Sequence, residues 1–476
     1  MRCQRPPATG NAGPATLFEP RALVQGVYRW GAASGLGSSL PIGPSCAKPR
    51  FWHTEHLPEA GHMSHTLKAS LALLCTCLTL SACTRSPLPT PSPAPTPTAT
   101  RAPLPTPPAP KYDPEPICIT VCSSGCDFVS VQAAIDDAGT SANDVITVTD
   151  AVHTEAGIIA NKDVTIQGLG ADRTIVQAHA NLLQALDRVF IVPERTRAAI
   201  QGMTIRHGHP YERPLSGGGV ANYGELTLVK SVVRDNSAND GGGIFNHGTM
   251  TILDCSVHAN LADREAPPGL QCGSGGGIKN GFGATLYMEN SAVHRNRALG
   301  KAGGLFVACE GAAWLTNCTF SGNLADRDGG GVYVKGDAEI THCTIFGNST
   351  KPQGGGLYVR SQATLTNSLI AGKLPGDVVV GGPGGYQGKG VLNADVYNWI
   401  ADRSCESDFS GDPLLDRLGD NGGDTLTHAL LPDSPAIDAT PATACSVPND
   451  QRGQSRPVEV GSGQPLCDVG AYEAQP

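Results

Sequence analysis

Between Gly217 and Lys373 the chain repeats one pattern six times, and no other feature of the sequence constrains the fold as strongly. Each copy opens on a glycine turn, continues through alternating apolar residues, and closes on a small residue, an apolar residue and usually an asparagine. Such a repeat is typical of a solenoid, because single copies are too short to bury a core and must stack on one another. The glycine turns begin at Gly217, Gly241, Gly275, Gly303, Gly329 and Gly354, and the closing asparagines are Asn236, Asn260, Asn296, Asn323 and Asn348.

The spacing inside each copy identifies the kind of solenoid. A step of two keeps side chains on one face of a strand, and a step of three lets the chain turn a corner while the next residue still points inward. No helical spacing fits these segments. We therefore predict an all-β fold, a right-handed parallel β-helix. The first copy has its inward residues at Leu226, Leu228, Ser231, Val233 and Asn236, and the fourth has them at Ala313, Leu315, Cys318, Phe320 and Asn323.

Composition agrees with this fold. The chain has 59 glycines and only 5% aromatic residues, which suits corners that need positive φ and an interior too narrow for many large rings. A formal net charge of −9, without a cluster of Lys and Arg, argues against a nucleic-acid-binding surface.

Residues 63–83 have the pattern of an export signal. Lys68 supplies a short positive region, and residues 69–80 form an apolar stretch too short for a permanent membrane helix. The segment ends in a Leu-Ser-Ala-Cys motif at Cys83, which resembles the bacterial lipobox. This resemblance implies that Cys83 carries a diacylglycerol lipid, begins the mature protein, and makes the membrane a partner. The alternative is an ordinary signal peptide with an incidental cysteine.

The segments on either side of this signal have no core of their own. Residues 1–62 show no strand or helix period, and we interpret them as an upstream extension that arises from a misplaced start codon. Residues 84–116 are rich in Pro, Thr, Ser and Ala, and this composition favours a semi-rigid stalk on the order of 90 Å long. We therefore expect a lipid-anchored protein at the cell envelope or cell surface. Thr84 after the lipidated cysteine resembles outer-membrane sorting, if the cell is Gram-negative.

The chain has 16 cysteines, a number that fits an exported protein. Cys118, Cys122 and Cys126 are spaced by fours before the first coil, and we predict a local disulfide there with Cys118 and Cys126 as its candidates. A metal cluster is the alternative, although no histidine or acidic residue joins these thiols. Cys445 and Cys467 flank a loop and are candidates for a second bridge.

Two inward columns are interpreted as structure rather than as sites. Cys255, Cys318 and Cys343 share a register position with serines of other coils, which indicates a ladder of small interior residues, although Cys318 and Cys343 are close enough in stacked coils to bond. The amides of the closing asparagines are expected to bond to backbone groups at the corners.

The two ends of the solenoid carry different patterns. Residues 128–137 have apolar spacing suited to a short helix, and the strands expected after it resemble the cap and first coils of pectate-lyase-like β-helices. Such ends must be covered, because open strand edges invite aggregation. We assign residues 117–215 to this cap and the first coils, 216–373 to the glycine-rich repeats, and 374–476 to a terminal coil and an irregular capping domain.

The last region contains a series of short motifs. In order they are Ser-Gly-Asp-Pro-Leu-Leu from Ser410, Asp-Asn-Gly-Gly-Asp from Asp420, Asp-Gln-Arg-Gly from Asp450 and Asp-Val-Gly-Ala-Tyr-Glu from Asp468. Together they resemble the choice-of-anchor Q domain of secreted bacterial β-helix proteins. The resemblance implies surface display and a capping fold, and it brings no catalytic residues.

The inward register also predicts which side chains share an outward face. Strands of neighbouring coils lie about 4.8 Å apart, so one polar patch is expected on the surface. The patch would bind an acidic sugar or supply His258 or His294 as a general base, and a merely solvated face is the alternative. Its members are Arg234, Asp235, His258, His294 and Arg295.

Two further outward columns are aromatic. Exposed rings suit stacking against the C–H faces of sugars, so these residues are candidates for a carbohydrate-binding surface. The alternative is that residues 372–410 or the terminal domain cover them. One column places Tyr287 beside Trp314, and the other contains Phe245, Phe306, Tyr333 and Tyr358.

Evidence for catalysis is sparse. Enzymes of the pectate-lyase-like fold that cleave uronan chains need calcium-binding carboxylates with a basic residue, or paired aspartates. Asp326 and Asp328, with Asp240 two coils away, are candidates, but Asp before a glycine turn is also ordinary turn chemistry. Calcium is the single cofactor we consider. We expect a surface protein that binds or adheres to carbohydrate, and leave a polysaccharide lyase or glycoside hydrolase as the alternative.

Overall fold

The computed structural model describes most of the chain that follows the predicted stalk. Cys83, the signal segment, the stalk and Lys373 lie outside the described residues. No helix of the described part is long and apolar enough to span a membrane. The described residues are 117–211, 215–263, 273–351, 354–372, 376–381, 390–394, 397–405, 407–460 and 463–476.

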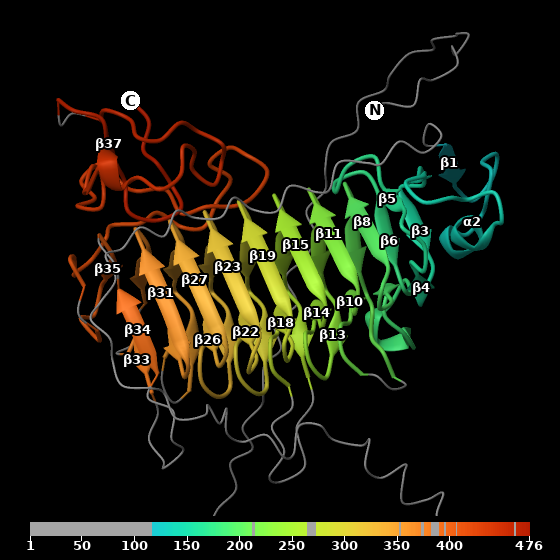
Figure 1. Cartoon of the computed structure of the whole chain (residues 1–476), viewed down its shortest axis with the longest axis horizontal. Coiled ribbons are helices and arrows are strands. Elements are labelled where there is room, and N and C mark those ends of the chain that lie inside the picture. Colours follow the sequence, from blue (N-terminus) through green and yellow to red (C-terminus); the bar gives the residue numbers. More distant parts are fainter. Residues whose placement is uncertain are drawn as a thin grey trace, which may run out of the picture. The chain divides into compact units, whose positions relative to one another are not determined.

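These residues form a parallel β-solenoid, and each coil contributes one strand to each of three long sheets, here named A, B and C. Neighbouring strands of a sheet come from successive coils, and sheet A lies in front in Figure 1. The predicted all-β, right-handed parallel β-helix is confirmed. Sheet A consists of β1 (Cys118–Val121), β2 (Val145–Val148), β5 (Thr165–Gln167), β8 (Arg197–Gln201), β11 (Glu225–Val229), β15 (Thr249–Leu253), β19 (Thr285–Glu289), β23 (Ala312–Thr316), β27 (Asp337–Thr341), β31 (Gln362–Thr366) and β34 (Val391–Ala394).

The remaining parallel strands follow sheet A in each coil. Sheet B consists of β3 (Val152–Thr154), β6 (Ile175–Gln177), β9 (Thr204–Arg206), β12 (Val232–Arg234), β16 (Ser256–His258), β20 (Ala292–His294), β24 (Thr319–Ser321), β28 (Thr344–Phe346), β32 (Leu369–Ala371) and β35 (Trp399–Ile400). Sheet C consists of β4 (Ile158–Ile159), β7 (Phe190–Val192), β10 (Val220–Asn222), β14 (Ile244–Asn246), β18 (Ile278–Asn280), β22 (Leu305–Val307), β26 (Val332–Val334), β30 (Leu357–Val359) and β33 (Val378–Val380). A short fourth sheet between B and C consists of β13 (Ser237–Ala238), β17 (Leu261–Ala262), β21 (Arg297–Ala298), β25 (Leu324–Ala325) and β29 (Ser349–Thr350).

The steps of three in the sequence correspond to corners made by one residue with positive φ. Leu228 and Ser231 both point inward and are buried, while Lys230 between them has a φ of 44°. Left-handed backbone is most accessible to glycine, asparagine and aspartate, which supply five of the seven residues at the corner between sheets A and B, with Lys230 and His342 as the exceptions. The corner between sheets A and B, here the AB corner, is formed by Gly202, Lys230, Asp254, Asn290, Asn317, His342 and Asn367.

The corner after sheet B offers a direct test of this backbone strain. Ala259 is exposed with a φ of 54°, whereas Gly322 has a φ of 60° and open space where a Cβ would lie. Ala259→Gly is expected to raise the free energy of unfolding by about 0.5–1 kcal/mol, and Gly322→Ala to lower it by about 1 kcal/mol. Urea unfolding followed by circular dichroism measures both. Shifts of the same sign in the two variants would contradict this account of the corners.

Inside the coils, the closing asparagines form a continuous hydrogen-bonded ladder. The Nδ2 of Asn260 donates to Val233 O at 2.9 Å and to Asn296 Oδ1 at 3.0 Å. The predicted bond to backbone is therefore present, and a side-chain bond to the next coil accompanies it. A second ladder joins Asn222, Asn246 and Asn280 in sheet C, with 2.7 Å at both steps.

The interior cysteines pack as small residues. Cys255, Cys318 and Cys343 are fully buried and free. Their thiols lie close to backbone carbonyl oxygens, as in the 3.2 Å contact from Cys318 Sγ to Thr316 O. Burial raises the pKa of Cys318 well above its ordinary value, so this thiol stays protonated.

A short helix lies at the N-terminal end, within the predicted segment 128–137. Helix α2 (Val131–Asp136) is capped by the Ser130 side chain, which accepts from Ala133 N. The carboxylate of Glu155 accepts from Val131 N at 2.7 Å and from Gln132 N at 2.9 Å. Since Val131, Ala134 and Ile135 are buried, α2 presents its apolar side to the first coils.

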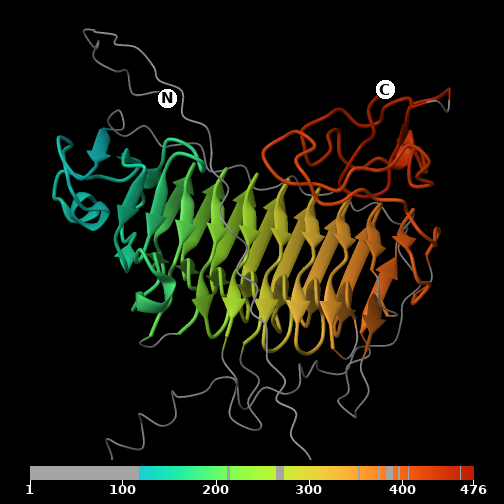
Figure 2. The same ribbon diagram turned by 180° about the vertical axis from the view of Figure 1, so that it is seen from behind.

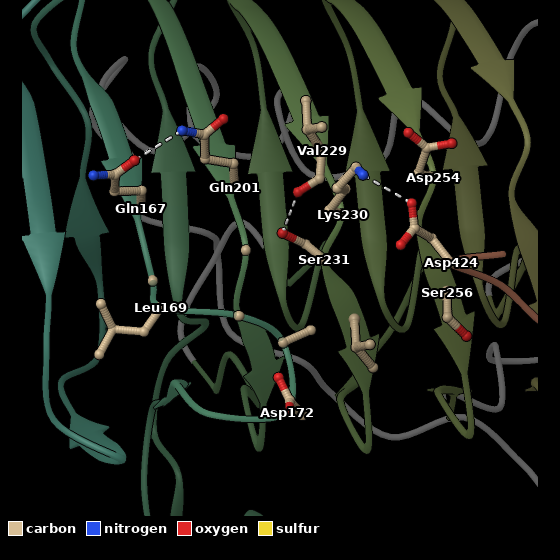
Figure 3. Close-up of a pocket in the computed structure, with 15 residues that line it drawn as sticks. Gln167, Leu169, Asp172, Gln201, Val229, Lys230, Ser231, Asp254, Ser256 and Asp424 are labelled. Carbon is tan, nitrogen blue, oxygen red and sulfur yellow. Dashed lines mark hydrogen bonds and ion pairs between the residues drawn. The ribbon is translucent and has the colours of Figure 1, made fainter. Parts of the chain in front are cut away.

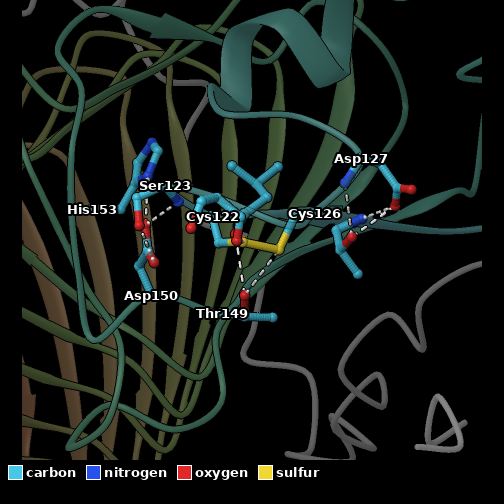
Figure 4. Close-up of a disulfide and its surroundings, with 10 residues drawn as sticks. Cys122, Ser123, Cys126, Asp127, Thr149, Asp150 and His153 are labelled. Atoms are coloured by element: carbon cyan, nitrogen blue, oxygen red, sulfur yellow. Dashed lines mark hydrogen bonds and ion pairs between the residues drawn. A yellow bond between two sulfur atoms is a disulfide. The ribbon is translucent and has the colours of Figure 1, made fainter. Parts of the chain in front are cut away.

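The disulfide beside this helix joins Cys122 to Cys126, with their Cα atoms 5.6 Å apart (Figure 4). Cys118 is also disulfide-bonded, so the expected pairing of Cys118 with Cys126 is wrong. Cys118 starts strand β1, and an extended strand carries the chain about 3.3 Å further at each residue. The turn at Gly125, where φ is 82°, brings Cys126 back to Cys122 instead.

Residues 410–476, here the terminal domain, pack on the outer face of sheet B (Figures 1 and 2). Thr319 Oγ1 donates to Gln451 Oε1 at 2.6 Å, and Ala471 N donates to Thr344 Oγ1 at 3.0 Å. The domain has little regular structure of its own. It contains η2 (Ala442–Ala444) and the antiparallel pair β36 (Thr440–Pro441) and β37 (Leu466–Cys467), while the short helix η1 (Leu182–Gln184) belongs to the first coils.

Within the terminal domain, the charged residues of the short motifs bind one another. Arg452 pairs with Asp450 at 2.7 Å and lies 3.7 Å above the Tyr472 ring. Arg456 pairs with Glu473 at 3.0 Å, and both side chains are fully buried. A disulfide joins Cys445 to Cys467, the pair proposed from the sequence. These motif residues therefore hold the domain together and attach it to the solenoid.

Candidate functional site

A groove of about 490 Å³ runs along the AB corner over the earlier coils (Figure 3). Corner side chains point outward, so Lys230 and Asp254 form one side of it. Gln167 and Gln201 come from the ends of β5 and β8, and Asp424 reaches in from the terminal domain. The groove is thus assembled from segments more than 250 residues apart in the chain.

Electrostatics in the groove are dominated by carboxylates. Lys230 Nζ lies 2.9 Å from Asp424, and the hydrogen bond with Asp424 raises the pKa of Lys230. Burial raises the pKa of Asp254, the Asp424 carboxylate raises it further, and a hydrogen bond with Asn290 opposes the rise. The only lysine lining the groove is therefore already neutralised, whereas Asp254 forms no ion pair within the described residues.

The polar patch predicted from the outward register lies beside this groove, on sheet B. Arg234, His258 and His294 occupy the same position on β12, β16 and β20, and the two imidazole rings stack with centroids 4.7 Å apart. Arg234 forms an ion pair with Asp235, and Arg295 is exposed. His294 is buried, whereas the other four side chains of the patch remain accessible to solvent.

His294 is poorly suited to act as a general base. It is 4% exposed, and its Nε2 lies 3.2 Å from Ser256 Oγ, while its Nδ1 has no hydrogen-bond partner in the described part of the chain. Burial, and then the nearby His258 and Arg295, lower the pKa of His294 to about 3. Burial also lowers the pKa of His258. Both imidazoles are therefore neutral and weakly basic near pH 7, so the proposed role as a general base is not favoured.

The buried imidazole makes stability depend on pH in a definite direction. Folded His294 stays neutral down to a pKa of about 3, whereas the unfolded chain binds a proton below pH 6.5. Its contribution is complete above pH 6.5 and is lost as the pH falls, by about 2–3 kcal/mol at pH 4.5. Wild type and His294→Gln are compared by urea unfolding at pH 7 and pH 4.5. Equal losses in both proteins would contradict the assignment.

Tyr287 and Trp314 lie side by side on the outer face of sheet A. Their ring centroids are 4.9 Å apart with an angle of 18° between the planes, and both side chains are half-buried. Thr251 precedes the pair in the same column and Glu339 follows it. Each ring thus covers one face of the other, and the pair is partly exposed to solution between Thr251 and Glu339.

The second aromatic column is mostly covered, so the expectation of an exposed surface is wrong there. Phe306, Tyr333 and Tyr358 stack in sequence but are only 9%, 0% and 4% exposed. Lys301 extends from the glycine-turn corner, with its Nζ 4.9 Å from the Tyr333 ring centroid and 3.2 Å from the hydroxyl. Phe245, at the other end of the column, is half-buried.

The three aspartates considered for a metal have cationic partners instead. Asp240 lies 2.9 Å from Lys279, Asp326 lies 3.1 Å from Lys351, and Asp328 lies 3.6 Å from Lys301. Among the described residues, no three His, Cys, Asp or Glu side chains converge in a way that would hold a metal ion. The geometry of these residues therefore gives no support to a calcium site.

The sequence interpretation missed the groove. In the sequence, Lys230, Asp254 and Asn290 occupy the same position of successive copies, just before the inward residue that follows the corner. The repeat therefore already indicates that these three residues form one column. Asp424 was visible only as part of a motif. That Asp424 meets Lys230 depends on how the terminal domain packs, which the repeat does not encode.

The fold and its coils define the class of protein, a right-handed parallel β-helix. Residues 190–373 match the family model described as right handed beta helix region. Among solved structures, the pectate lyase Pel9A is 14% identical with a TM-score of 0.45, and the match covers 76% of this chain and 98% of that one. The pectin methylesterase from carrot is 9% identical with a TM-score of 0.37, and the match covers 60% of this chain and 90% of that one. No curated protein matches the chain in sequence. At these levels of similarity we carry no residue role or activity over to this chain.

Proposed function

We propose that this protein is displayed at the cell envelope through a lipid on Cys83 and binds carbohydrate on the outer face of sheet A. The lipobox-like motif and the proline-rich stalk support the display. The choice-of-anchor Q resemblance supports it as well, as a feature of secreted surface proteins. The β-helix domain would then be the part of the molecule that meets external ligands.

The observation that carries the binding proposal is the accessible Tyr287–Trp314 pair. Partly exposed aromatic rings suit the C–H faces of sugars, and neighbouring hydroxyl groups orient the ligand. The outer face of sheet A supplies such groups in rows, because many of its outward residues are threonines. These include Thr227, Thr249, Thr251, Thr285, Thr341, Thr364 and Thr366.

The geometry of a solenoid favours a polymer over a single sugar. Within each row the threonines stand in short runs, such as Thr249 with Thr285 and Thr341 with Thr366, with roughly 4.8 Å between neighbouring coils. A glycan that lies along this axis would therefore meet a hydroxyl group at each of the neighbouring coils of a run. The aromatic pair, which interrupts the row between Thr251 and Thr364, would fix the position of one sugar residue.

The test uses glycan-affinity electrophoresis of the whole protein and its variants. A Tyr287→Ala/Trp314→Ala double variant is expected to weaken binding about tenfold, because it removes the stacking surface. Tyr211→Ala is the matched control, since Tyr211 is 76% exposed and belongs to the connection between β9 of sheet B and β10 of sheet C. Unchanged binding by the double variant would exclude the aromatic pair as the binding site.

Lipid attachment needs its own experiment. Cys83→Ser is expected to abolish incorporation of radiolabelled palmitate and to release the protein from the membrane fraction. Labelling of the serine variant at the level of wild type would contradict the lipid anchor.

A polysaccharide lyase or glycoside hydrolase is the second candidate, and one observation favours it. Asp254 and Asp424 line the same groove in different environments, with the pKa of Asp254 raised by burial and Asp424 paired with Lys230. Carboxyl groups whose environments differ can divide acid and base roles. Release of reducing or unsaturated ends from polysaccharides by wild type, but not by Asp254→Asn, would establish this activity.

A further inference from the structure

The AB-corner groove carries a charge pattern that selects its ligand. Three aspartates line it, Asp172, Asp254 and Asp424, and one lysine, Lys230. The net formal charge of the lining is therefore three negative charges less one positive, or −2. Asp424 is paired with Lys230 at 2.9 Å and Asp172 with Arg173 at 4.0 Å, so Asp254 is the lining carboxylate without an ion pair among the described residues. An anionic ligand would be repelled by Asp254, so uronic-acid polymers are poor occupants of this groove.

Asp254 is the residue that most needs a partner. It is half-buried, forms no ion pair within the described residues, and its pKa is raised by that burial. A desolvated carboxylate gains most from a cation that approaches it closely. A hydrogen bond with Asn290 and the charge of Lys230 oppose the rise in the pKa of Asp254, but the ammonium group of Lys230 itself lies against Asp424 at 2.9 Å.

The rest of the groove is built for hydroxyl groups. Side-chain amides of Gln167 and Gln201 lie at one end, joined by a 3.0 Å hydrogen bond, and the Ser256 hydroxyl lies at the other (Figure 3). A volume of about 490 Å³ falls in the range of small-molecule sites. Gln167 also donates to Thr147 Oγ1 at 2.9 Å, and Ser256 Oγ lies 3.2 Å from His294 Nε2. These groups would therefore bind the hydroxyl groups of a ligand through their remaining lone pairs.

We propose that this groove binds an amino sugar, with its protonated amine against Asp254 and its hydroxyl groups against the amide and serine side chains. The site is separate from Tyr287 and Trp314 on sheet A, so it goes beyond the general glycan binding proposed above. The ligand class is a glycan with free amines, such as a chain of unacetylated glucosamine units.

Calorimetry on the whole protein tests the assignment with four probes. A β-1,4-linked glucosamine tetramer is expected to bind at least about tenfold more tightly than its N-acetylated form. A galacturonate tetramer is expected to bind more weakly than either. Spermidine, which has amines but no sugar ring, should also bind about tenfold more weakly than the glucosamine tetramer. Equal affinities for the free and acetylated tetramers, or equal affinity for spermidine, would overturn the proposal.

Two variants and a control locate the site. Asp254→Asn is expected to weaken glucosamine-tetramer binding about tenfold, and asparagine suits the φ of 53° at this corner, so the backbone is preserved. Lys230→Gln should strengthen binding, because it removes the competing ammonium group and frees Asp424. Misfolding cannot produce such a gain. Asp433→Asn, at an exposed aspartate of the terminal domain outside the groove lining, should have no effect.

The outcomes also separate this inference from the proposed function. If the Tyr287→Ala/Trp314→Ala variant loses glycan binding while wild type does not discriminate amines, the groove assignment fails and the sheet A assignment stands. Loss of amine selectivity in Asp254→Asn with sheet A binding intact supports the groove alone. Unchanged binding in both Asp254→Asn and Lys230→Gln overturns the groove assignment.

Discussion

Asn296→Ala is expected to lower the free energy of unfolding by about 3–5 kcal/mol, more than any exposed substitution in the repeats. The side chain takes part in four hydrogen bonds. Its Oδ1 accepts from the backbone and side-chain nitrogens of Asn260 at 3.0 Å each, and its Nδ2 donates to Val257 O at 2.8 Å and Asn323 Oδ1 at 3.0 Å. Each buried partner left without its bond costs roughly 1–3 kcal/mol, and alanine cannot replace any of them.

Urea unfolding monitored by far-ultraviolet circular dichroism measures this loss. Asn393→Ala is the control, because Asn393 is an exposed asparagine on sheet A. We expect it to change stability by less than about 0.5 kcal/mol. A similar small effect for Asn296→Ala would mean that the ladder contributes little to the stacking of coils.

Arg456→Met is the second substitution with a large expected effect. Arg456 and Glu473 are both fully buried and lie 3.0 Å apart, and Arg456 also contacts His342 of the solenoid. Removing one partner of a buried pair costs about 3–5 kcal/mol, since the other group is left uncompensated. Burial raises the pKa of Glu473 to about 8 although the Arg456 guanidinium lowers it, so removal of Arg456 is expected to raise this pKa further and favour the protonated carboxyl.

A double variant separates loss of the pair from loss of packing. Arg456→Met/Glu473→Gln is expected to recover at least half of the lost melting temperature, because no unpaired charge remains. Limited proteolysis of residues 410–433 reports whether the terminal domain has separated from sheet B. Arg327→Met, at an exposed arginine of the solenoid, is the control. A double variant less stable than Arg456→Met alone would contradict this explanation.

The β-helix and its register could be predicted because they are encoded locally. Alternation of two and three residues recurs in every copy, and Leu226, Leu228 and Val233 are buried in the structure as that spacing predicts. When equal coils stack, residues at the same position in successive copies lie side by side. The sequence therefore predicted that His258 lies beside His294, as the structure shows. These relations require no knowledge of distant contacts.

Exposure of the outward columns was less predictable. Tyr287 and Tyr333 occupy equivalent outward positions of their strands, yet one is half-exposed and the other is fully buried. Tyr333 is stacked between the rings of Phe306 and Tyr358, and Lys301 of the adjacent corner also lies over it. Tyr287, by contrast, stacks on Trp314. Similarly, His294 is buried next to β24, whose Ser321 is bound by His428 of the terminal domain at 2.8 Å.

By itself, the sequence determined the solenoid, because its corners and inward residues depend on neighbours two or three positions apart. Only the tertiary structure decided where function can lie. The groove forms where Asp424 of the terminal domain meets Lys230 and Asp254 of the AB corner. This contact depends on how the terminal domain packs against the solenoid. The terminal domain has no copy of the repeat, so the repeat pattern cannot predict which of its residues lies beside which coil.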